Sequence, residues 1–325
     1  MADAEAYGFE VDWYDKQADL LRVYQLTVMR PQRGPLEAAM YDPKTKRGFL
    51  KRMPVPELRM ENLYVGSTVT LHGRQLKIRG YLDERTKQAL EVNRESFVLL
   101  TAPDVFYQLG KIVSCLEGLG LTISRLRLVN DNGPVVAIQV MGADAEFKWD
   151  DAQNAIPPGH ARQVPLQQGE AYFTDKNRFP STAACDHCTL CVIRPHTLKA
   201  QNAGVIIQDI MEAGFEVSAM RTVHLDRAQA TEFLEVYQNV LPNFSDLVAI
   251  MSEAPCLAME LRKEDNVVEE FRSLCGPYDL DMARHLRPNS LRARFGVDNA
   301  QNGVHSTDLE EDAEREVRYI FEMLA

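Results

Sequence analysis

Residues 302–308 read Asn302-Gly303-Val304-His305-Ser306-Thr307-Asp308, and Glu316 follows eight positions after the aspartate. A histidine with an amide three residues before it, a hydroxyl two residues after it and a carboxylate to orient it can act as a phosphate-accepting nucleophile. Two further runs, Gly276–Asp279 and Arg292–Gly296, lie upstream of it and follow an apolar strand and a helix. The stretch therefore predicts a phosphoryl-transfer site in the last part of the chain.

This arrangement resembles the nucleoside diphosphate kinases. The resemblance implies a ferredoxin-like α/β fold and ping-pong transfer of a γ-phosphate through the histidine, with His305 as the nucleophile. Glu316 matches the carboxylate that accepts from the other ring nitrogen and fixes the tautomer. An active enzyme of this family would use a nucleoside triphosphate and Mg²⁺. The alternatives are an inherited histidine on an idle fold and a glutamate that faces solvent on the last helix.

The same resemblance implies a set of nucleotide-binding groups. The set holds two phosphate-binding arginines, a tyrosine beside the nucleophile, an amide for the ribose and the hydroxyl residue after the histidine: Arg272, Arg292, Tyr237, Asn302 and Thr307. Arg194 replaces a family lysine in Ile193-Arg194-Pro195-His196, which keeps the charge but exchanges a compact ammonium for a planar fork. The arginines could equally be charges at the edge of the core or on the surface.

Several positions depart from the family pattern. Asn243 aligns with the phenylalanine that stacks on the base, and the larger Tyr278 aligns with a threonine near the phosphates. Two extra residues, His285 and Leu286, are expected in the loop that frames the cleft. Losing one preorganised electrostatic contact commonly costs on the order of 10² to 10³ in rate. The sequence thus predicts weak or no turnover.

An internal repeat precedes this site. Residues 120–127 are similar to 214–221, and residues 134–140 are similar to 255–261. Both segments of the first pair follow a predicted helix, and both segments of the second pair precede one. We call residues 95–178 the first repeat and residues 185–325 the second repeat. Only six residues separate the two strands of the first repeat, against 33 in the second, so the first repeat lacks 27 residues of helical hairpin.

The first repeat is predicted to be catalytically dead. It contains no Asn-x-x-His-x-Thr-Asp sequence, and His160 stands in a proline-rich stretch as an expected loop histidine. The segment after Gln153 is expected to be irregular connection, because it carries Pro157, Pro158 and Gly159 and then Gln167-Gln168-Gly169.

The N-terminal part alternates short strands with turn residues from Phe9 to about Leu82 and shows few helical signals. Trp13-Tyr14-Asp15, Gly48–Arg52 and Asn62–Gly66 occur in an order similar to the doublet-microtubule domain of ciliary proteins, over about residues 7–92. That resemblance implies a small pleckstrin-like β fold. The predicted class is therefore α+β multidomain: a β domain at 1–92, a truncated kinase-like domain at 95–178 and a kinase-like domain at 185–325.

This order of units resembles the axonemal branch of the nucleoside diphosphate kinases. The resemblance implies a cytoskeletal place in the axoneme of cilia and flagella, on the luminal side of doublet microtubules. The partners that it implies are α/β-tubulin, other luminal doublet proteins and, in animals, the γ-tubulin complex. The first hypothesis is a structural microtubule inner protein, and the second is an active kinase that works through His305.

The net charge of −11 is unevenly spread, with +2 over residues 1–95 and −13 over the rest. Five cations fall within nine residues: Lys44, Lys46, Arg47, Lys51 and Arg52. We call them the basic cluster. They indicate either a solvated loop and strand edge or a dock for an acidic polymer surface such as tubulin. Nucleic acid is a less suitable partner, since the whole chain is acidic and lacks interleaved aromatic and basic platforms.

Cysteine spacing and hydropathy bear on metal and membrane binding. Cys185, His187, Cys188 and Cys191 have metal-ligand spacing, but residues 188–193 read as a buried strand and no second pair follows, so no metal is expected. No stretch approaches the roughly 18 to 20 apolar residues that span a bilayer, and the first residues are acidic rather than a signal sequence. We expect a cytoplasmic protein that does not bind membranes.

Overall fold

The computed structural model describes residues 5–15, 18, 20–31, 34–56, 58, 60, 63–72, 74–91, 95–101, 107–153, 156 and 159–324. Asn62, Pro157 and Pro158, which the sequence patterns above include, lie outside these residues. The chain divides into two compact units, Met1–Arg94 and Glu95–Ala325. Within the described residues, no helix is both long enough and apolar enough to cross a bilayer.

The first unit is a six-stranded antiparallel sheet followed by one helix. Alternation of apolar and polar residues places one face of most strands in the core, which includes Phe9, Leu26 and Leu76, whereas the strand Arg47–Pro54 contributes only the half-buried Leu50. The strand order is β4-β3-β2-β1-β6-β5, so β4 is an edge strand. The elements are β1 Glu5–Asp15, β2 Leu20–Arg30, β3 Glu37–Asp42, β4 Arg47–Pro54, β5 Thr68–Leu71, β6 Arg74–Tyr81 and α1 Glu84–Glu91.

The second unit contains both repeats. The first repeat supplies β7 Glu95–Thr101, α2 Leu109–Gly118, β8 Thr122–Asn130, β9 Pro134–Gly142, α3 Ala145–Gln153, β10 Ala161–Val164 and α4 Leu166–Thr174. The second repeat supplies β11 Cys188–Ile193, α5 Pro195–Lys199, α6 Ala203–Glu212, β12 Glu216–Val223, α7 Arg227–Phe233, η3 Glu235–Tyr237, α8 Phe244–Glu253, β13 Cys256–Arg262, α9 Val267–Cys275, α10 Leu280–Leu286, α11 Leu291–Phe295, β14 Val304–Ser306, α12 Glu310–Arg318 and η4 Tyr319–Met323.

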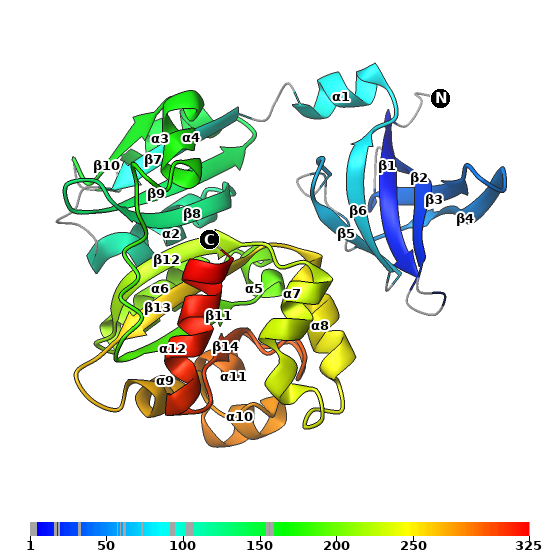
Figure 1. Ribbon diagram of the computed structural model, residues 1–325. Helices are drawn as coiled ribbons and strands as arrows, with labels where there is room; N and C mark the ends of the chain where they lie inside the picture. The colour runs from blue at the N-terminus through cyan, green and yellow to red at the C-terminus, as the bar shows by residue number, and fades with distance from the viewer. Residues whose placement is uncertain are drawn as a thin grey trace. The chain divides into compact units, whose positions relative to one another are not determined.

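The two repeats share one eight-stranded antiparallel sheet in the order β10-β7-β9-β8-β12-β13-β11-β14 (Figure 1). This order is a palindrome: each repeat runs fourth, first, third, second strand towards the centre. At the centre β8 meets β12, with Arg127 opposite Arg221. The predicted repeat is therefore confirmed. The hairpin missing from the first repeat is α7, η3 and α8, which lie between β12 and β13.

The repeats are related by a pseudo-twofold axis, which brings α2 against α6. Equivalent positions in this region differ by 94 residues, as Arg127 and Arg221 do. A Cβ atom on Gly110 would lie 2.6 Å from the backbone nitrogen of Gln208, and one on Gly204 would lie 2.2 Å from that of Ser114. Ser114 and Gln208 are themselves 94 positions apart, so each glycine lets the opposite helix approach in the same way.

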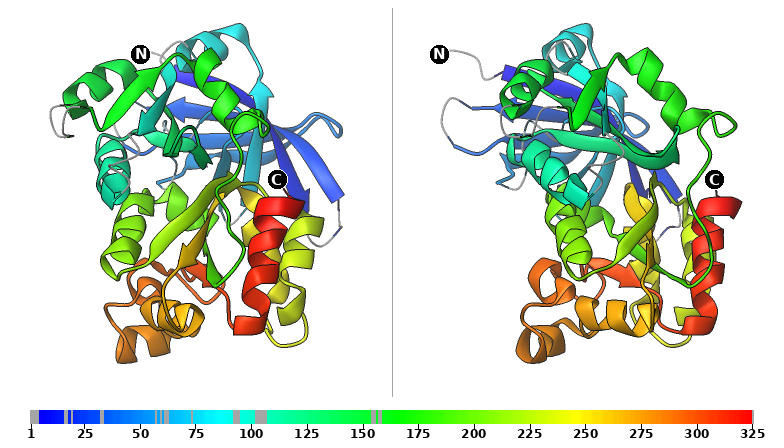
Figure 2. Two further views of the ribbon diagram at one scale, coloured as in Figure 1. Left: turned by 60° about the vertical axis from the view of Figure 1, so that its left-hand side comes forward. Right: turned by 90° about the vertical axis from the view of Figure 1, so that its left-hand side faces the viewer.

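Helices cover both faces of this sheet. In both views of Figure 2 the red helix α12 and the yellow-green hairpin of α7 and α8 lie on one side of the sheet. Their apolar side chains form a core with Leu190 and Val192, whereas α6 and α9 join α2 and α3 in the core on the opposite face. His305 lies on β14 at the sheet edge, between these layers.

Two sequence expectations were wrong. The segment after Gln153 contains β10 and α4 rather than irregular connection alone. Gly169 is needed for packing and does not break the helix, since a Cβ atom there would lie 2.4 Å from the Val98 side chain. The extra residues His285 and Leu286 form the exposed end of α10 instead of a loop. The predicted strand at Cys188–Ile193 is β11, as expected.

Candidate active site in the second repeat

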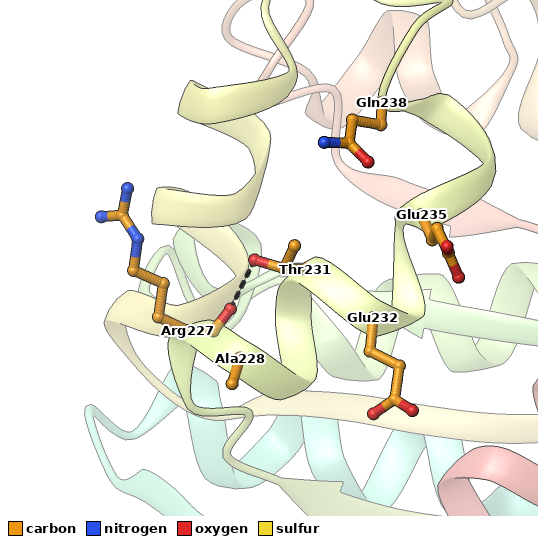
Figure 3. Close-up of a pocket in the computed structure, with 6 residues that line it drawn as sticks. All are labelled: Arg227, Ala228, Thr231, Glu232, Glu235 and Gln238. Carbon is orange, nitrogen blue, oxygen red and sulfur yellow. Dashed lines mark hydrogen bonds between the residues drawn. The ribbon is translucent and has the colours of Figure 1, made fainter.

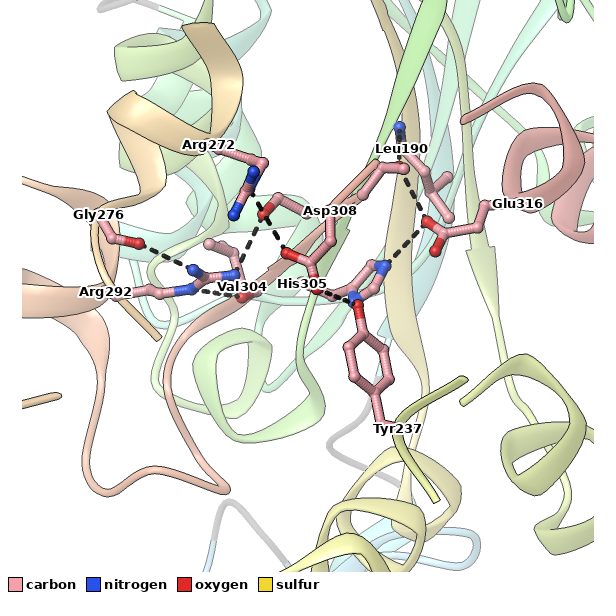
Figure 4. Close-up of polar contacts among 11 residues, drawn as sticks. Leu190, Tyr237, Arg272, Gly276, Arg292, Val304, His305, Asp308 and Glu316 are labelled. Atoms are coloured by element: carbon pink, nitrogen blue, oxygen red, sulfur yellow. Dashed lines mark hydrogen bonds and ion pairs between the residues drawn. The ribbon is translucent and has the colours of Figure 1, made fainter. Parts of the chain in front are cut away.

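His305 is held by a buried carboxylate. Its Nε2 lies 3.0 Å from Oε2 of Glu316, and the Thr307 hydroxyl donates to the same oxygen at 2.8 Å (Figure 4). The Leu190 amide donates to the Thr307 hydroxyl, which ties this network to β11. His305 is 3% exposed and Glu316 7%, so Glu316 does not face solvent. The contact leaves Nδ1 as the nitrogen that is free of the carboxylate.

Tyr237 and Arg272 both contact Asp308. The Tyr237 hydroxyl donates to Oδ2 of Asp308 at 2.7 Å, and Nε of Arg272 lies 3.5 Å from Oδ1 (Figure 4). Burial, together with Asp308, raises the pKa of the Tyr237 hydroxyl well above its usual range. The Tyr237 ring stands edge-on to the His305 ring with centroids 6.3 Å apart. The expected tyrosine is thus beside the expected nucleophile.

The Arg292 guanidinium binds the chain's own acceptors. Nη1 donates to the Gly276 carbonyl at 2.8 Å, Nη2 to the Ser306 hydroxyl at 3.1 Å and Nε to the Val304 carbonyl at 3.4 Å. Arg292 is only 6% exposed. These contacts use three of the five N–H donors of the guanidinium, which leaves one N–H on each of Nη1 and Nη2.

Arg194 and Asn302 are also buried. Arg194 donates from Nη1 to the Ala300 carbonyl, and its Nε has no partner. Burial and the neighbouring Arg292 lower the pKa of Arg194 to about 10. Asn302 donates to the Tyr278 carbonyl at 3.5 Å, while its Oδ1 is buried without a partner. The structure therefore brings the predicted site residues together and buries most of them, while Arg272 stays exposed and Tyr237 half-buried.

The positions that depart from the family pattern lie around this cluster. The Tyr278 ring lies against Arg292, with the guanidinium carbon 5.9 Å from the ring centroid, and its hydroxyl is buried without a partner. Asn243, which aligns with the base-stacking phenylalanine, begins α8 and makes no side-chain capping bond. A tyrosine against the arginine and an amide in place of an aromatic ring both disfavour nucleotide binding.

The first repeat has arginine where the second has His305. Strand register defines equivalent places, counted outwards from the Arg127–Arg221 pair at the centre of the sheet. The residues opposite one another on successive strands are Arg127, Ala137, Leu100 and Arg162 in the first repeat, and Arg221, Ala258, Val192 and His305 in the second. His160 is two residues away from this place. The register supports the expected absence of a nucleophile from the first repeat.

Internal hydrogen bonds and burial limit how several of the expected residues could contact the nucleotide that the family implies. Arg292 gives three of its five N–H donors to internal acceptors and is buried, whereas Arg272, the other expected phosphate-binding arginine, is exposed. Among the described residues, no group of three or more histidine, cysteine, aspartate or glutamate side chains could hold a metal ion.

A hollow of about 650 Å³ lies elsewhere, along the outer side of α7 and η3 (Figure 3). Its lining residues are mostly exposed: Arg227, Ala228, Thr231, Glu232, Glu235 and Gln238. None of them belongs to the predicted site. The hollow is therefore separate from the predicted site, since none of its lining residues is His305 or a residue expected to bind nucleotide.

The basic cluster lies on and beside the edge strand β4 of the first unit. Lys44 and Lys46 stand in the turn before it, which Asp42 closes by accepting from the Lys44 amide at 2.8 Å. Arg47, Lys51 and Arg52 are exposed on β4, and Arg52 pairs with Glu37. The exposed Phe49 packs on Tyr24 with centroids 4.5 Å apart. The cluster is thus a solvated strand edge that remains accessible to a partner.

Sequence reasoning assigned no role to two groups of the site. Asp308 joins Tyr237 to Arg272, and Ser306 accepts from Arg292. Both residues lie within residues 302–308, so their closeness to His305 in the sequence could have indicated that they belong to the site.

Comparisons with known proteins bear on the whole chain. The family model described as nucleoside diphosphate kinase matches residues 187–324. Nucleoside diphosphate kinase homolog 7 of Rattus norvegicus is 33% identical over 375 aligned positions, which cover 99% of this chain and 94% of the relative. The Mus musculus protein of the same name gives the same identity and coverage.

Single-domain enzymes match the second repeat. Nucleoside diphosphate kinase of Aquifex aeolicus is 34% identical over 133 residues, covering 41% of this chain and 92% of the relative. A crystal structure of the Aquifex aeolicus enzyme matches with 33% identity and a TM-score of 0.40, covering 42% of this chain and 95% of that one. The identity to the rat and mouse proteins extends over nearly all of both chains. The chain belongs to the nucleoside diphosphate kinase homolog 7 family.

Proposed function

We propose that this protein is a structural component of ciliary and flagellar doublet microtubules, built on kinase-like repeats with weak or no turnover. The internal hydrogen bonds of the Arg292 guanidinium carry the proposal, because they engage three of the five N–H donors of the group that should bind the transferred phosphate. Burial of His305, Asn302 and Arg194 supports it further. Arg162 stands in the first repeat at the position that His305 occupies in the second, so the first repeat does not offer a second phosphotransfer site.

The axonemal part of the proposal rests on the first unit. Its motif order resembles the doublet-microtubule domain, and its basic cluster offers cations to an acidic partner such as tubulin. The expected partners remain α/β-tubulin and other luminal doublet proteins, with the γ-tubulin complex as a further candidate. In such a role the protein would contribute buried contact area to the doublet rather than catalytic turnover.

Charge reversal tests the docking surface. Lys44, Lys46 and Lys51 are exposed members of the basic cluster, and Lys77, Lys111 and Lys176 are exposed lysines elsewhere. Replacing the first three by glutamate is expected to reduce binding of the full chain to isolated doublet microtubules, while the matched control set leaves it near wild type. Equal binding by both variants would contradict a docking role for the basic cluster.

A phosphoenzyme assay tests the alternative, an active kinase. The His305–Glu316 contact favours this alternative, since it orients the ring for attack through Nδ1. We expect the full chain to show at least about a hundredfold less turnover than the Aquifex aeolicus enzyme, on the scale of one lost electrostatic contact. Acid-labile phosphate that forms at the rate of that enzyme and disappears in His305→Ala would establish the kinase instead.

A further inference from the structure

The N-terminus of α6 in the second repeat is capped by a residue of the first repeat. Asn202 at the N-cap makes no side-chain capping bond. Instead the amides of Ala203 and Gly204 donate to the two carboxylate oxygens of Glu117 in α2, at 3.1 and 3.0 Å. All three residues are buried, and Glu117 is 8% exposed. The first N–H groups of a helix have no partner within the helix and favour an anion. The contact with Glu117 therefore satisfies both the amides and the carboxylate.

The pseudo-twofold axis gives no such carboxylate to the other helix. The offset of 94 that relates Gly110 to Gly204 and Ser114 to Gln208 relates Glu117 to Met211. Met211 is half-buried and packs against the apolar core between the repeats. Its thioether is a poor acceptor for two backbone amides. The helix pair is therefore symmetric in its close glycine contacts and asymmetric in its polar cap.

This asymmetry decides which surfaces can pair. Two second repeats joined through α6 and β12 would place Met211 of each copy beside the α6 start of the other. Two buried amides on each helix would then lack the acceptor that Glu117 supplies, and a buried donor without an acceptor is costly. Pairing of the first repeat with the second avoids that loss at α6.

We infer that the pairing surface of the second repeat is specific for the first repeat of this chain and rejects a second copy of itself, with Glu117 as the residue that sets the choice. The inference is independent of the proposed function, because it concerns how the repeats associate and not what they bind. It also gives the first repeat a use that needs no chemistry: it completes the capping of α6.

Hydrogen exchange on the full chain tests the contact. In Glu117→Met the Ala203 and Gly204 amides are expected to exchange about tenfold faster or more, as the loss of a buried hydrogen bond implies. Glu117→Gln, which retains one acceptor oxygen and nearly the same volume, is expected to show a smaller change. Peptides from Met1–Arg94 serve as the internal control for folding. Unchanged α6 protection in Glu117→Met would overturn the inference.

A relocation variant tests the partner choice. Combining Glu117→Met with Met211→Glu places a carboxylate where only a second copy of the second repeat can present it to α6. At low concentration α6 should remain unprotected. On concentration, this variant, but not Glu117→Met alone, should approach twice the monomer mass of 36.8 kDa and regain α6 protection. Protection regained by the monomer, or a monomer mass at every concentration, would overturn the choice of partner.

Discussion

The two repeats share a sheet order and a pairing surface, but only one keeps the residues of a phosphotransfer site. Strand register puts Arg162 where the second repeat has His305, and a short turn replaces α7, η3 and α8. The helices α2 and α6 nevertheless meet through equivalent glycines. The catalytic and pairing surfaces lie on separate elements, so the first can be lost while the second is kept.

The segment from α4 to Phe179 covers the sheet of the first repeat in place of the missing hairpin. Tyr172 of α4 stacks on Phe179 with centroids 4.0 Å apart. Arg127 donates to the carbonyls of both residues, at 2.9 and 3.0 Å. The equivalent Arg221 donates to the Ile320 carbonyl in η4. Equivalent arginines thus anchor different segments over the same face, and burial lowers the pKa of both.

Gly204→Ala should destabilise the surface between α2 and α6 most strongly. The new Cβ atom would lie 2.2 Å from the Ser114 amide nitrogen, and backbone atoms of a packed helix cannot move aside cheaply. We expect a loss of about 3 kcal/mol or more in the free energy of unfolding, measured with denaturant. Gly118→Ala at the end of α2 is the matched control, since its Cβ would meet nothing within 4 Å. Similar losses in both variants would contradict the close-approach argument.

Acid should weaken the second repeat through His196. Burial and then Arg194 lower the pKa of this imidazole from 6.5 to about 4. Between these values the unfolded chain binds a proton that the folded chain excludes, so stability is complete above pH 6.5 and falls as the pH drops towards 4. The loss should be about 3 kcal/mol at most. Denaturant unfolding at pH 7 and pH 4.5 should show a smaller decrease in His196→Gln than in wild type; equal decreases would exclude His196 as a cause.

Glu316→Ala should cost less, about 1 to 3 kcal/mol, because it leaves His305 and Thr307 buried without their shared acceptor. The measurement is again denaturant unfolding. Glu314→Ala on the same helix is the matched control, since that side chain is exposed and its removal should change stability by less than about 0.5 kcal/mol. A Glu316 variant as stable as the Glu314 variant would show that the carboxylate does not hold the ring.

Most of the second unit's topology could be predicted from periodicity. The buried strand at Cys188–Ile193 and the repeat that pairs residues 120–127 with 214–221 both follow from side-chain alternation and local similarity. The helix α4 was missed because glycine and glutamine suggest a loop, whereas Gly169 is small in order to pack on Val98.

The site residues could be predicted as a set, but their partners could not. The His305–Glu316 contact joins groups that the motif already places near one another. The carbonyls that occupy Arg292 come from loop backbone at Gly276 and from Val304, which carry no side-chain signal. Glu117 in turn looks like an ordinary helix residue until the pseudo-twofold axis places it against α6.

The smallest expected effect comes from Arg162→His, which gives the first repeat the imidazole that its register place lacks. Arg162 is exposed, so stability should change by less than about 0.5 kcal/mol. No phosphohistidine should form in mass spectrometry after incubation with nucleoside triphosphate and Mg²⁺. The reason is that a nucleophile needs an orienting base and cations for the phosphate, and the first repeat has lost the hairpin that carries Tyr237 in the second. Phosphate on the new histidine would mean that the sheet edge alone suffices, and that the repeats differ less than their structures indicate.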